Sequence, residues 1–394
     1  MTAVASTLDS VRQLAPTIRA HVNDIEQERS LPEPVVRGLV DAGVFRMLMP
    51  RSLGGDELEP MTVCRVIEEA ASQDGAVGWC TMIGAANGYF GGLLPAEGAR
   101  EVYADRDVVL AAVFRPTGEA VAVEGGFCVT GRWPFASGIL HSQWVGGNCR
   151  ILDDDGPRLT PSGSVVMKLL FLPRAEASVI DTWYTAGLRG TGSHDFEVND
   201  IFVPAARSLW FADPPAERGP LYSLPAITLF APMIASVSLG IARHALEIFK
   251  ELAPLKKPVW SQEALGRSPV AQSQVGQAEG LLRAGRAFLF ESLTEAWVAA
   301  CSGLPLSWEQ RGLLWLSATQ AVTQALQTVD IAYRTAGASS VHASTGLERC
   351  LRDIRTASQH IQVLPTNYEL AGQLFLGADM STTAWNRDNR GDAV

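Results

Sequence analysis

Several features that would assign a chain of 394 residues to a common functional class are missing from this sequence. The six cysteines are scattered and form no C-x-x-C pair, so neither a zinc site nor a disulfide scaffold is indicated. We therefore expect reduced thiols and a cytoplasmic protein. The net charge of −10 argues against nucleic acid as a partner, because phosphate binding needs basic patches.

Membrane segments and common catalytic motifs are also missing. No uncharged apolar run reaches ~18 residues, so we expect no membrane-spanning helix, and the first residues do not resemble a signal peptide. The sequence has no G-x-S-x-G, no H-E-x-x-H and no acidic cluster, which argues against a serine hydrolase and against a metal site. Gly190 and Gly192 begin a dinucleotide fingerprint, but Asp195 stands where its last glycine belongs, so no NAD(P)H site is recognised.

What is present divides the chain into three parts. Residues 1–104 carry helical patterns: one amphipathic helix over 11–25, one opened by Pro32 and Pro34 and ending at Gly43, one over 62–72, and a buried apolar segment over 77–94. Residues 105–212 contain β-branched and aromatic runs, with a hairpin turn at Gly125-Gly126, which predicts an antiparallel sheet or small barrel.

Residues 213–394 return to helical periodicity. Four long apolar stretches, at 227–249, 274–301, 308–337 and 347–376 with a break near Pro365, indicate a four-helix bundle. Helices this apolar commonly bury surface against other subunits, so we expect a homo-oligomer.

The stretch Gly131–Gly138, GRWPFASG, carries the strongest chemical signal. It reads as a strand that must end or bulge at Pro134, because proline cannot donate to a ladder. Trp133 and Phe135 supply flat apolar rings and Ser137 supplies a hydroxyl, a combination that suits a planar heterocycle such as a flavin. The alternative is a sheet edge with buried aromatic rings.

This stretch resembles the flavin-facing strand of the flavin-dependent monooxygenases built on the acyl-CoA dehydrogenase fold, the oxygenase halves of two-component systems. The segments DAGVFRMLMPRSLGG and EEAASQDGAVGW resemble the N-terminal helical domain of the same fold. The resemblance implies an acyl-CoA dehydrogenase-like α+β fold, with an N-terminal helical domain (1–104), a central antiparallel β domain (105–212) and a C-terminal four-helix bundle (213–394), assembled as a homotetramer.

The resemblance also implies flavin contacts. A serine at the position of Ser137 lies near the flavin N5, and the glycine loop, residues 187–198, lies beside the flavin. The segment 263–274, often from a neighbouring subunit, contacts the flavin phosphate. The predicted cofactor-binding residues are Trp133, Phe135, Ala136, Ser137, Arg189, Thr191, Ser193, Arg267, Ser268, Gly337 and Ala338.

His360 is the most informative histidine. Acyl-CoA dehydrogenases place a catalytic glutamate between an Arg-Asp pair and an Ile-Gln pair. Here Arg352-Asp353 and Ile361-Gln362 enclose His360, and no glutamate lies between Glu348 and Glu369. An imidazole can deprotonate a phenol or hydrogen-bond a peroxide, so Ser137 and His360 are the predicted catalytic residues. A histidine satisfied in a helix contact is the alternative.

The resemblance therefore predicts an oxygenase that takes reduced FMN or FAD from a separate NAD(P)H-dependent reductase, adds O2 at the flavin C4a, protects the hydroperoxide in a dry pocket and hydroxylates a small aromatic or heteroaromatic substrate. His141, Trp144 and His194, with Trp183, are predicted to line the pocket. Three alternatives stay open: an acyl-CoA dehydrogenase-like FAD flavoprotein, an N- or S-oxygenating enzyme of the same fold, and a non-catalytic bundle protein.

Overall fold

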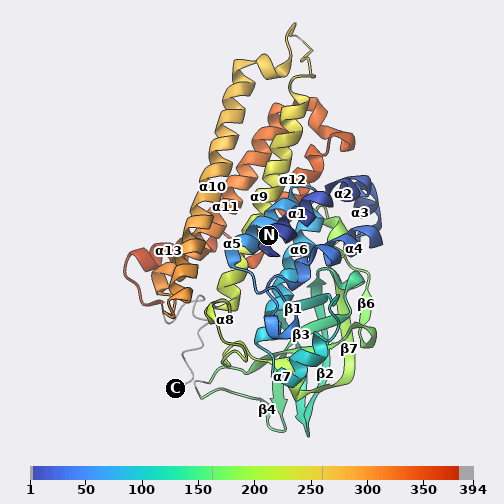
Figure 1. The fold of residues 1–394 in the computed structure, drawn as a ribbon, viewed down its shortest axis with the longest axis vertical. Helices are drawn as coiled ribbons and strands as arrows, with labels where there is room; N and C mark the ends of the chain where they lie inside the picture. The colour runs from blue at the N-terminus through green and yellow to red at the C-terminus, as the bar shows by residue number, and fades with distance from the viewer. Residues whose placement is uncertain (1–2, 162, 260, 381–394) are drawn as a thin grey trace.

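Helices from both ends of the chain pack together, and the middle of the chain forms a sheet at one end of an elongated molecule (Figure 1). The computed structural model describes residues 3–161, 163–259 and 261–380. Three regions thus follow one another in the predicted order, although the boundaries at 104 and 212 stay predictions.

The N-terminal region contains the predicted helices, with one correction. The single amphipathic helix predicted over 11–25 is three short helices, α1 (Ala3–Gln13), α2 (Ala15–Ala20) and α3 (Val22–Glu28). Pro16 lies in the first turn of α2 and has no N–H to donate to the preceding turn, so the first helix cannot continue unbroken. The next helix ends at Gly43 with φ 79°, as predicted. This helix is α4, and three more helices follow it in the N-terminal region. Their bounds are α4 (Glu33–Ala42), α5 (Pro60–Ala71), α6 (Gly75–Gly88) and α7 (Ala96–Val102).

The middle of the chain forms one eight-stranded sheet in the order β6-β7-β2-β1-β3-β5-β8, with β4 paired to β3. Val123 pairs with Gly126, so the first hairpin turns at Glu124-Gly125, one residue before the predicted turn. The strands are β1 (Leu110–Val123), β2 (Gly126–Ala136), β3 (Trp144–Asp153), β4 (Gly156–Pro157), β5 (Met167–Pro173), β6 (Ser178–Ile180), β7 (His194–Pro204) and β8 (Ser208–Leu209).

The sheet is not wholly antiparallel, which corrects the prediction. β1 and β3 pair in parallel, with Leu110 opposite Trp144. The reason is the connection after β2. Strand β2 returns to the end of the sheet where β1 began, residues 137–143 cross that end, and β3 starts beside the start of β1 and runs the same way.

The C-terminal region is the predicted bundle. Helix α10 begins at Pro269, and the Ser268 side chain accepts a hydrogen bond from the backbone of its first turn. The last predicted helix is interrupted over residues 358–365 by the 3-10 turn η11 (Ile361–Val363). The helices are α8 (Pro220–Ser223), α9 (Ala226–Leu252), α10 (Pro269–Cys301), α11 (Trp308–Thr335), α12 (Leu347–Ala357) and α13 (Thr366–Phe375).

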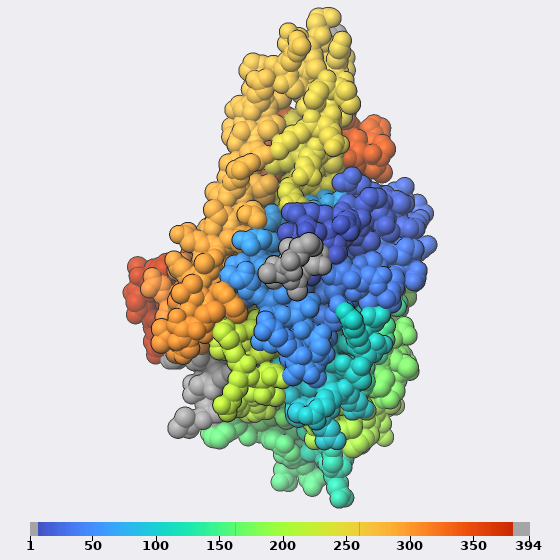
Figure 2. Space-filling view, in the orientation of Figure 1, coloured from blue at the N-terminus to red at the C-terminus, as the bar shows by residue number. Residues whose placement is uncertain are grey.

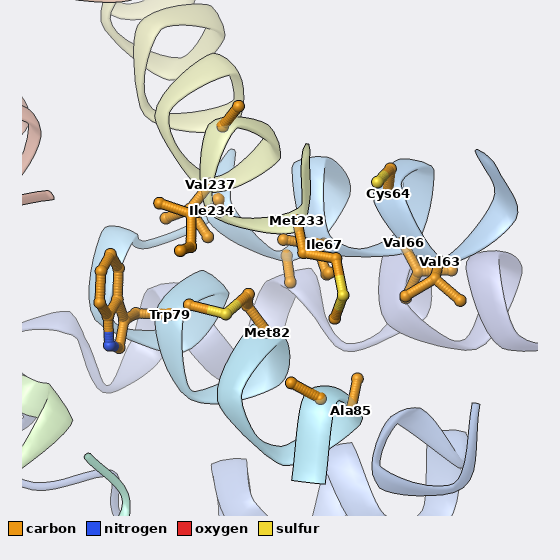
Figure 3. Packing of buried hydrophobic residues seen from close by; sticks show 14 of the residues in the cluster. Val63, Cys64, Val66, Ile67, Trp79, Met82, Ala85, Met233, Ile234 and Val237 are labelled. Atoms are coloured by element: carbon orange, nitrogen blue, oxygen red, sulfur yellow. The ribbon is translucent and has the colours of Figure 1, made fainter. Parts of the chain in front are cut away.

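One apolar core joins the N-terminal helices to the bundle, and a second lies within the sheet. In the first, Val63 and Ile67 of α5, Met82 of α6, and Met233 and Ile234 of α9 pack together (Figure 3). Helix α9 is long and apolar enough to cross a membrane, but 89% of its most apolar stretch is buried in the fold. It is accordingly a core helix that holds α5 and α6 in place.

Candidate active site

Ser137 lies at the end of β2 and is 6% exposed. Its Oγ is 2.7 Å from Oγ of Ser193, and Ser193 Oγ is 2.6 Å from Oγ1 of Thr191. Thr191 ends the 3-10 turn η6 (Arg189–Thr191), and Ser193 immediately precedes β7, which pairs with β2. Three predicted site residues from two separate stretches of sequence therefore meet in one buried cluster of hydroxyl groups.

Trp79 of α6 joins this cluster to His360, and sequence reasoning missed it. Its Nε1 donates to Ser137 Oγ at 3.1 Å, and its ring meets the His360 ring edge to face at 5.8 Å and 62°. Figure 3 shows its indole nitrogen pointing away from Ile234 and Val237 of α9. The only sequence signal was a single large ring in a run of small residues, because α6 is buried all round and has no polar face to orient it.

His360 precedes η11 and caps it through Nδ1, which accepts a hydrogen bond of 3.3 Å from the backbone N–H of Gln362. Burial lowers the pKa of His360 to about 4, so the ring is neutral at neutral pH. A neutral ring whose Nδ1 accepts must carry its proton on Nε2. Of the two predicted roles, hydrogen-bond donation therefore fits this geometry better than deprotonation of a phenol.

His141 lies against Gly138, the residue after Ser137, and its place in the pocket stays a prediction. It ends the 3-10 turn η4 (Ile139–His141), and a Cβ on Gly138 would come within 3.0 Å of its Nε2. Gly138 has φ 78°, so both its backbone conformation and the imidazole against it require glycine. Burial lowers the pKa of His141 to about 4. This second neutral imidazole borders the serine turn.

The aromatic wall consists of Phe135 and Trp183 and not of Trp133. Phe135 is 61% exposed, has φ 66°, and meets the Trp183 ring at 6.0 Å and 85°. Trp133 is 0% exposed: it stacks on Phe196 at 4.9 Å inside the sheet core, which contradicts the prediction that it faces a cofactor. The register shift between Trp133 and Ala136 is the bulge expected at Pro134, and it turns Phe135 outward.

The other two predicted pocket residues, His194 and Trp144, lie in different parts of the fold. His194 is buried, and its Nδ1 accepts from the backbone N–H groups of Thr182 and Trp183 at 3.2 and 3.3 Å, so it holds the segment that carries Trp183. Trp144 lies instead under the Arg207 guanidinium at 5.2 Å. In the described part of the chain, Trp144 makes no side-chain hydrogen bond or ring contact with the Ser137 cluster.

Arg189 and Asp353 anchor the glycine loop from opposite sides. Arg189 Nε donates to the Glu26 carbonyl of α3 at 3.1 Å, so this predicted cofactor contact is engaged within the fold. Asp353 of α12, 4% exposed, accepts from the backbone N–H of Leu188 at 2.6 Å. Burial first, and then the charge of buried Asp74, raise the pKa of Asp353 above its usual range. Asp353, which belongs to the Arg352-Asp353 pair that carried the family resemblance in the sequence, therefore holds the glycine loop in position.

Four predicted cofactor residues lie elsewhere. Arg267 and Ser268 precede α10, and Gly337 and Ala338 follow α11, at the end of the bundle away from the sheet (Figure 1). The Lys256 ammonium donates to the Ala336 carbonyl, so a cation lies beside the glycine turn. Within one chain, the structure does not bring these residues to the Ser137 cluster.

The Ser137 hydroxyl, the exposed Phe135 ring two residues before it and the neutral His360 imidazole that Trp79 connects to Ser137 are groups that suit a planar heterocycle with polar edges. A flavin is such a group, so the residues present fit it. Among residues 3–161, 163–259 and 261–380, no group of three or more His, Cys, Asp or Glu side chains is placed to hold a metal ion.

Comparison with known proteins identifies the family. The models of the acyl-CoA dehydrogenase N-terminal and C-terminal domains match residues 5–102 and 232–365. Indole-3-acetate monooxygenase of Pseudomonas putida is 32% identical over 376 residues, 95% of this chain and 93% of that protein. The oxygenase subunit HsaA of a flavin-dependent monooxygenase of Rhodococcus jostii is 26% identical over 88% of this chain and 92% of that protein.

Solved structures agree. XiaF from Streptomyces sp., solved in complex with FADH2 and glycerol, has a TM-score of 0.89 and 28% identity, covering 95% of this chain and 96% of that one. The match runs through the helices, the sheet and the bundle alike. The chain belongs to the flavin-dependent monooxygenases built on the acyl-CoA dehydrogenase fold.

Proposed function

We propose that this protein is the oxygenase component of a two-component system that hydroxylates a small heteroaromatic substrate with O2 and reduced FMN or FAD. One observation carries the proposal: Trp79 joins the Ser137 hydroxyl, two residues after the exposed Phe135 ring, to the His360 imidazole. Bound reduced flavin supplies the electrons that activate oxygen.

The residues of the chain would orient the flavin and the substrate and would keep water away from them. Phe135 and Trp183 form an apolar wall, and Ser137 would hold the polar edge of the flavin. The neutral His360 ring carries its proton on Nε2 and would donate a hydrogen bond from there to a bound oxygen atom or to the substrate. The buried surroundings of both side chains exclude water, which would otherwise release the oxygen as peroxide.

The substrate class follows from the relatives. The Pseudomonas putida protein, at 32% identity, is named for indole-3-acetate, a fused heteroaromatic acid. We therefore propose an indole-like ring as the substrate and test indole-3-acetate first. Because the sequence has no dinucleotide fingerprint, a separate NAD(P)H-dependent reductase is proposed to deliver the reduced flavin.

A homo-oligomer, which we propose to be a tetramer, would complete the site. The loop before α10 and the turn after α11 lie at the end of the bundle away from the sheet (Figure 1), so a neighbouring copy would supply Arg267 and Gly337 to the Ser137 cluster. The bundle offers surface for such contacts: α10 runs exposed along one side of the molecule (Figure 2), and Val298 and Leu304 border a groove of about 720 Å³ against the start of α11. Apolar surface of this kind marks subunit contacts.

The test is single-turnover oxidation. The purified protein is loaded anaerobically with chemically reduced FMN or FAD and mixed with oxygenated buffer containing indole-3-acetate, an unrelated phenol or an acyl-CoA. Hydroxylated product and hydrogen peroxide are both measured. We expect product from an aromatic substrate, with Ser137→Ala and His360→Ala releasing peroxide instead. Oxidation of the acyl-CoA, or peroxide alone with every aromatic substrate tried, would contradict the proposal.

A further inference from the structure

Gln362 belongs to the Ile361-Gln362 pair that carried part of the family resemblance, and the proposed function gives this glutamine no task. It is the second residue of η11 and is 7% exposed. Its backbone N–H donates to Nδ1 of His360 at 3.3 Å, so the glutamine and the imidazole are fixed on the same short turn. The buried side chain therefore starts next to a predicted catalytic residue.

The two ends of the Gln362 amide can be told apart by what they contact. Nε2 lies 3.3 Å from the carbonyl oxygen of Ile227, in the first turn of α9. A carbonyl oxygen only accepts hydrogen bonds, so the atom that faces it must be the amide nitrogen. A flipped amide would place two acceptors against each other. The position of Oε1 is therefore determined as well.

Oε1 of Gln362 is an acceptor without a donor. The atom is shielded from solvent, and among residues 3–161, 163–259 and 261–380 it has no hydrogen-bond partner. Folded proteins rarely keep a buried acceptor unpaired, because it lost its contacts with water when the chain folded. A molecule that supplies a hydrogen at this position would restore the missing bond.

His360 offers the complementary group on the same turn. Its Nδ1 accepts from Gln362, so its hydrogen is on Nε2, and in the described part of the chain Nε2 donates to no other residue. The turn thus presents one unused donor, on His360, and one unused acceptor, on Gln362. A ligand that satisfies both must itself carry a donor as well as an acceptor.

We propose that Oε1 of Gln362 accepts a hydrogen bond from the ring N–H of the substrate, so that Gln362 selects heteroaromatic rings that carry this donor. The inference rests on the proposed function, because it requires an aromatic substrate beside His360. Indole has such an N–H at the edge of its ring. Benzofuran has the same two-ring outline, but an oxygen without a hydrogen replaces the N–H and would face Oε1 with a lone pair.

Two other donors compete for this position in principle, the N3–H of the flavin ring and an enclosed water molecule. The substrate is favoured because Gln362 shares its turn with His360, which is assigned to the substrate and to bound oxygen. The predicted flavin contacts around Ser137 come instead from β2 and η6. The experiment is designed to separate all three donors.

The experiment measures dissociation constants of indole-3-acetate and benzofuran-3-acetate for the full chain, saturated with reduced FMN or FAD under anaerobic conditions so that no turnover occurs. Gln362→Met keeps the length of the side chain and removes Oε1. The matched control is Gln359→Met, the same change at an exposed residue whose amide donates to Ser358 Oγ at 3.4 Å. Thermal melting shows that each variant is folded. If Gln362→Met does not fold, Gln362→Asn replaces it, because its shorter side chain withdraws the acceptor.

We expect wild type and Gln359→Met to bind indole-3-acetate at least about tenfold more tightly than benzofuran-3-acetate. The Gln362 variant should lose most of this preference through weaker binding of the indole. Its affinity for reduced flavin alone should stay unchanged, because the flavin does not supply the hydrogen. A comparison of the two ligands in one variant removes any general effect of the substitution on the fold.

No preference in wild type, or the same preference in the folded Gln362 variant, would overturn the inference, leave an enclosed water as the partner of Oε1 and leave the proposed function standing. A loss of affinity for flavin would overturn it in favour of the flavin N3–H. Wild-type protein that forms no hydroxylated product from any aromatic substrate would overturn the proposed function, and the inference with it.

Discussion

Trp79 makes the contacts that join the two predicted catalytic residues, one through its N–H and one through its ring. The N–H donates to Ser137, which is the first of the three connected hydroxyl groups of Ser137, Ser193 and Thr191. Because one side chain performs both tasks, substitutions that separate them are informative.

Trp79→Phe keeps an aromatic ring beside His360 and removes the donor to Ser137. We expect product formed per flavin oxidised to fall about two- to tenfold, the range of one hydrogen bond, with a matching rise in peroxide. Trp297→Phe, in the bundle helix α10, is the control. Equal coupling in Trp79→Phe and wild type would show that the indole N–H is dispensable.

The lowered pKa of His360 predicts that the stability of the protein depends on pH. Its pKa is lowered to about 4 by burial, whereas the unfolded residue titrates near 6.5. Between these values the unfolded chain binds the proton more strongly, so stability falls as the pH drops from about 6.5 toward about 4. His141 and His244 contribute in the same direction. Melting curves of wild type and His360→Asn should therefore converge toward pH 4 and separate above 6.5; parallel curves would contradict the shift.

At the scale of elements, α12 holds the loop between β6 and β7 through one buried carboxyl group. Asp353 accepts from Leu188, and a Cβ on Gly187 would meet the Arg352 carbonyl at 2.2 Å, so helix and loop lie directly against each other. The loop in turn carries Thr191 and Ser193. The position of the site hydroxyls thus depends on a helix from the far end of the sequence.

Asp353→Ala leaves the buried Leu188 N–H without its acceptor, which costs about 1–3 kcal/mol of stability.

Asp353→Asn keeps an acceptor and removes the ionisable group. The pKa of Asp353 is raised to about 8, so the folded state binds its proton more tightly, and the stability this provides is lost as the pH rises from about 4 toward about 8. Denaturant unfolding across this range should show a smaller loss for Asp353→Asn than for wild type; identical slopes would contradict the assignment.

Strand β2 carries a core residue, Trp133, and an exposed predicted flavin contact, Phe135, two positions apart. Trp133→Phe removes a bond to the Asn148 carbonyl and leaves a void, so we expect a loss of about 1–3 kcal/mol of stability with unchanged affinity for reduced flavin. Phe135→Ala, at an exposed ring, should show the reverse: little change in melting temperature and weaker flavin binding. Weak flavin binding by a folded Trp133→Phe would restore the original prediction for that residue.

Periodicity in the sequence was enough to predict α4, α5 and the bundle helices, because each has an apolar stripe and end signals such as Gly43 and Ser268. It could not orient Trp79, since α6 is apolar on every side. It could not predict the parallel pairing of β1 with β3, which depends on where a connection crosses. Ser137 and His360 were predicted from resemblance, but their link through Trp79 is visible only in space.

At the scale of the whole molecule, the predicted cofactor residues form two groups. Ser137 and its neighbours lie where the sheet meets α6, whereas Arg267 and Gly337 lie next to the ends of α10 and α11 that are farthest from the sheet (Figure 1). The proposed oligomer would unite them by placing the bundle end of one copy against the sheet of another. The arrangement makes a prediction that does not depend on knowing the substrate.

Ser137→Ala and Arg267→Ala copies, each weakly active alone, should regain activity when unfolded and refolded together. A mixed pair builds one complete site from the intact Ser137 of one copy and the intact Arg267 of the other, so random pairing restores about a quarter of wild-type activity. Refolding each variant with itself is the control. Absence of recovery in verified mixed oligomers would place both residues in sites confined to one chain.

The crossing of residues 137–143 over the end of β1 bears on how the chain can be rewired. This segment is both the connection that makes β3 parallel to β1 and the carrier of Ser137, Gly138 and His141. A circular permutant opened at the Glu124-Gly125 turn, where only a hairpin is cut, would keep the crossing intact. A permutant opened within 137–143 would cut the connection between β2 and β3 and would also release Ser137 from its hydrogen-bond partners. The same seven residues therefore determine both the pairing of the strands and the position of the serine.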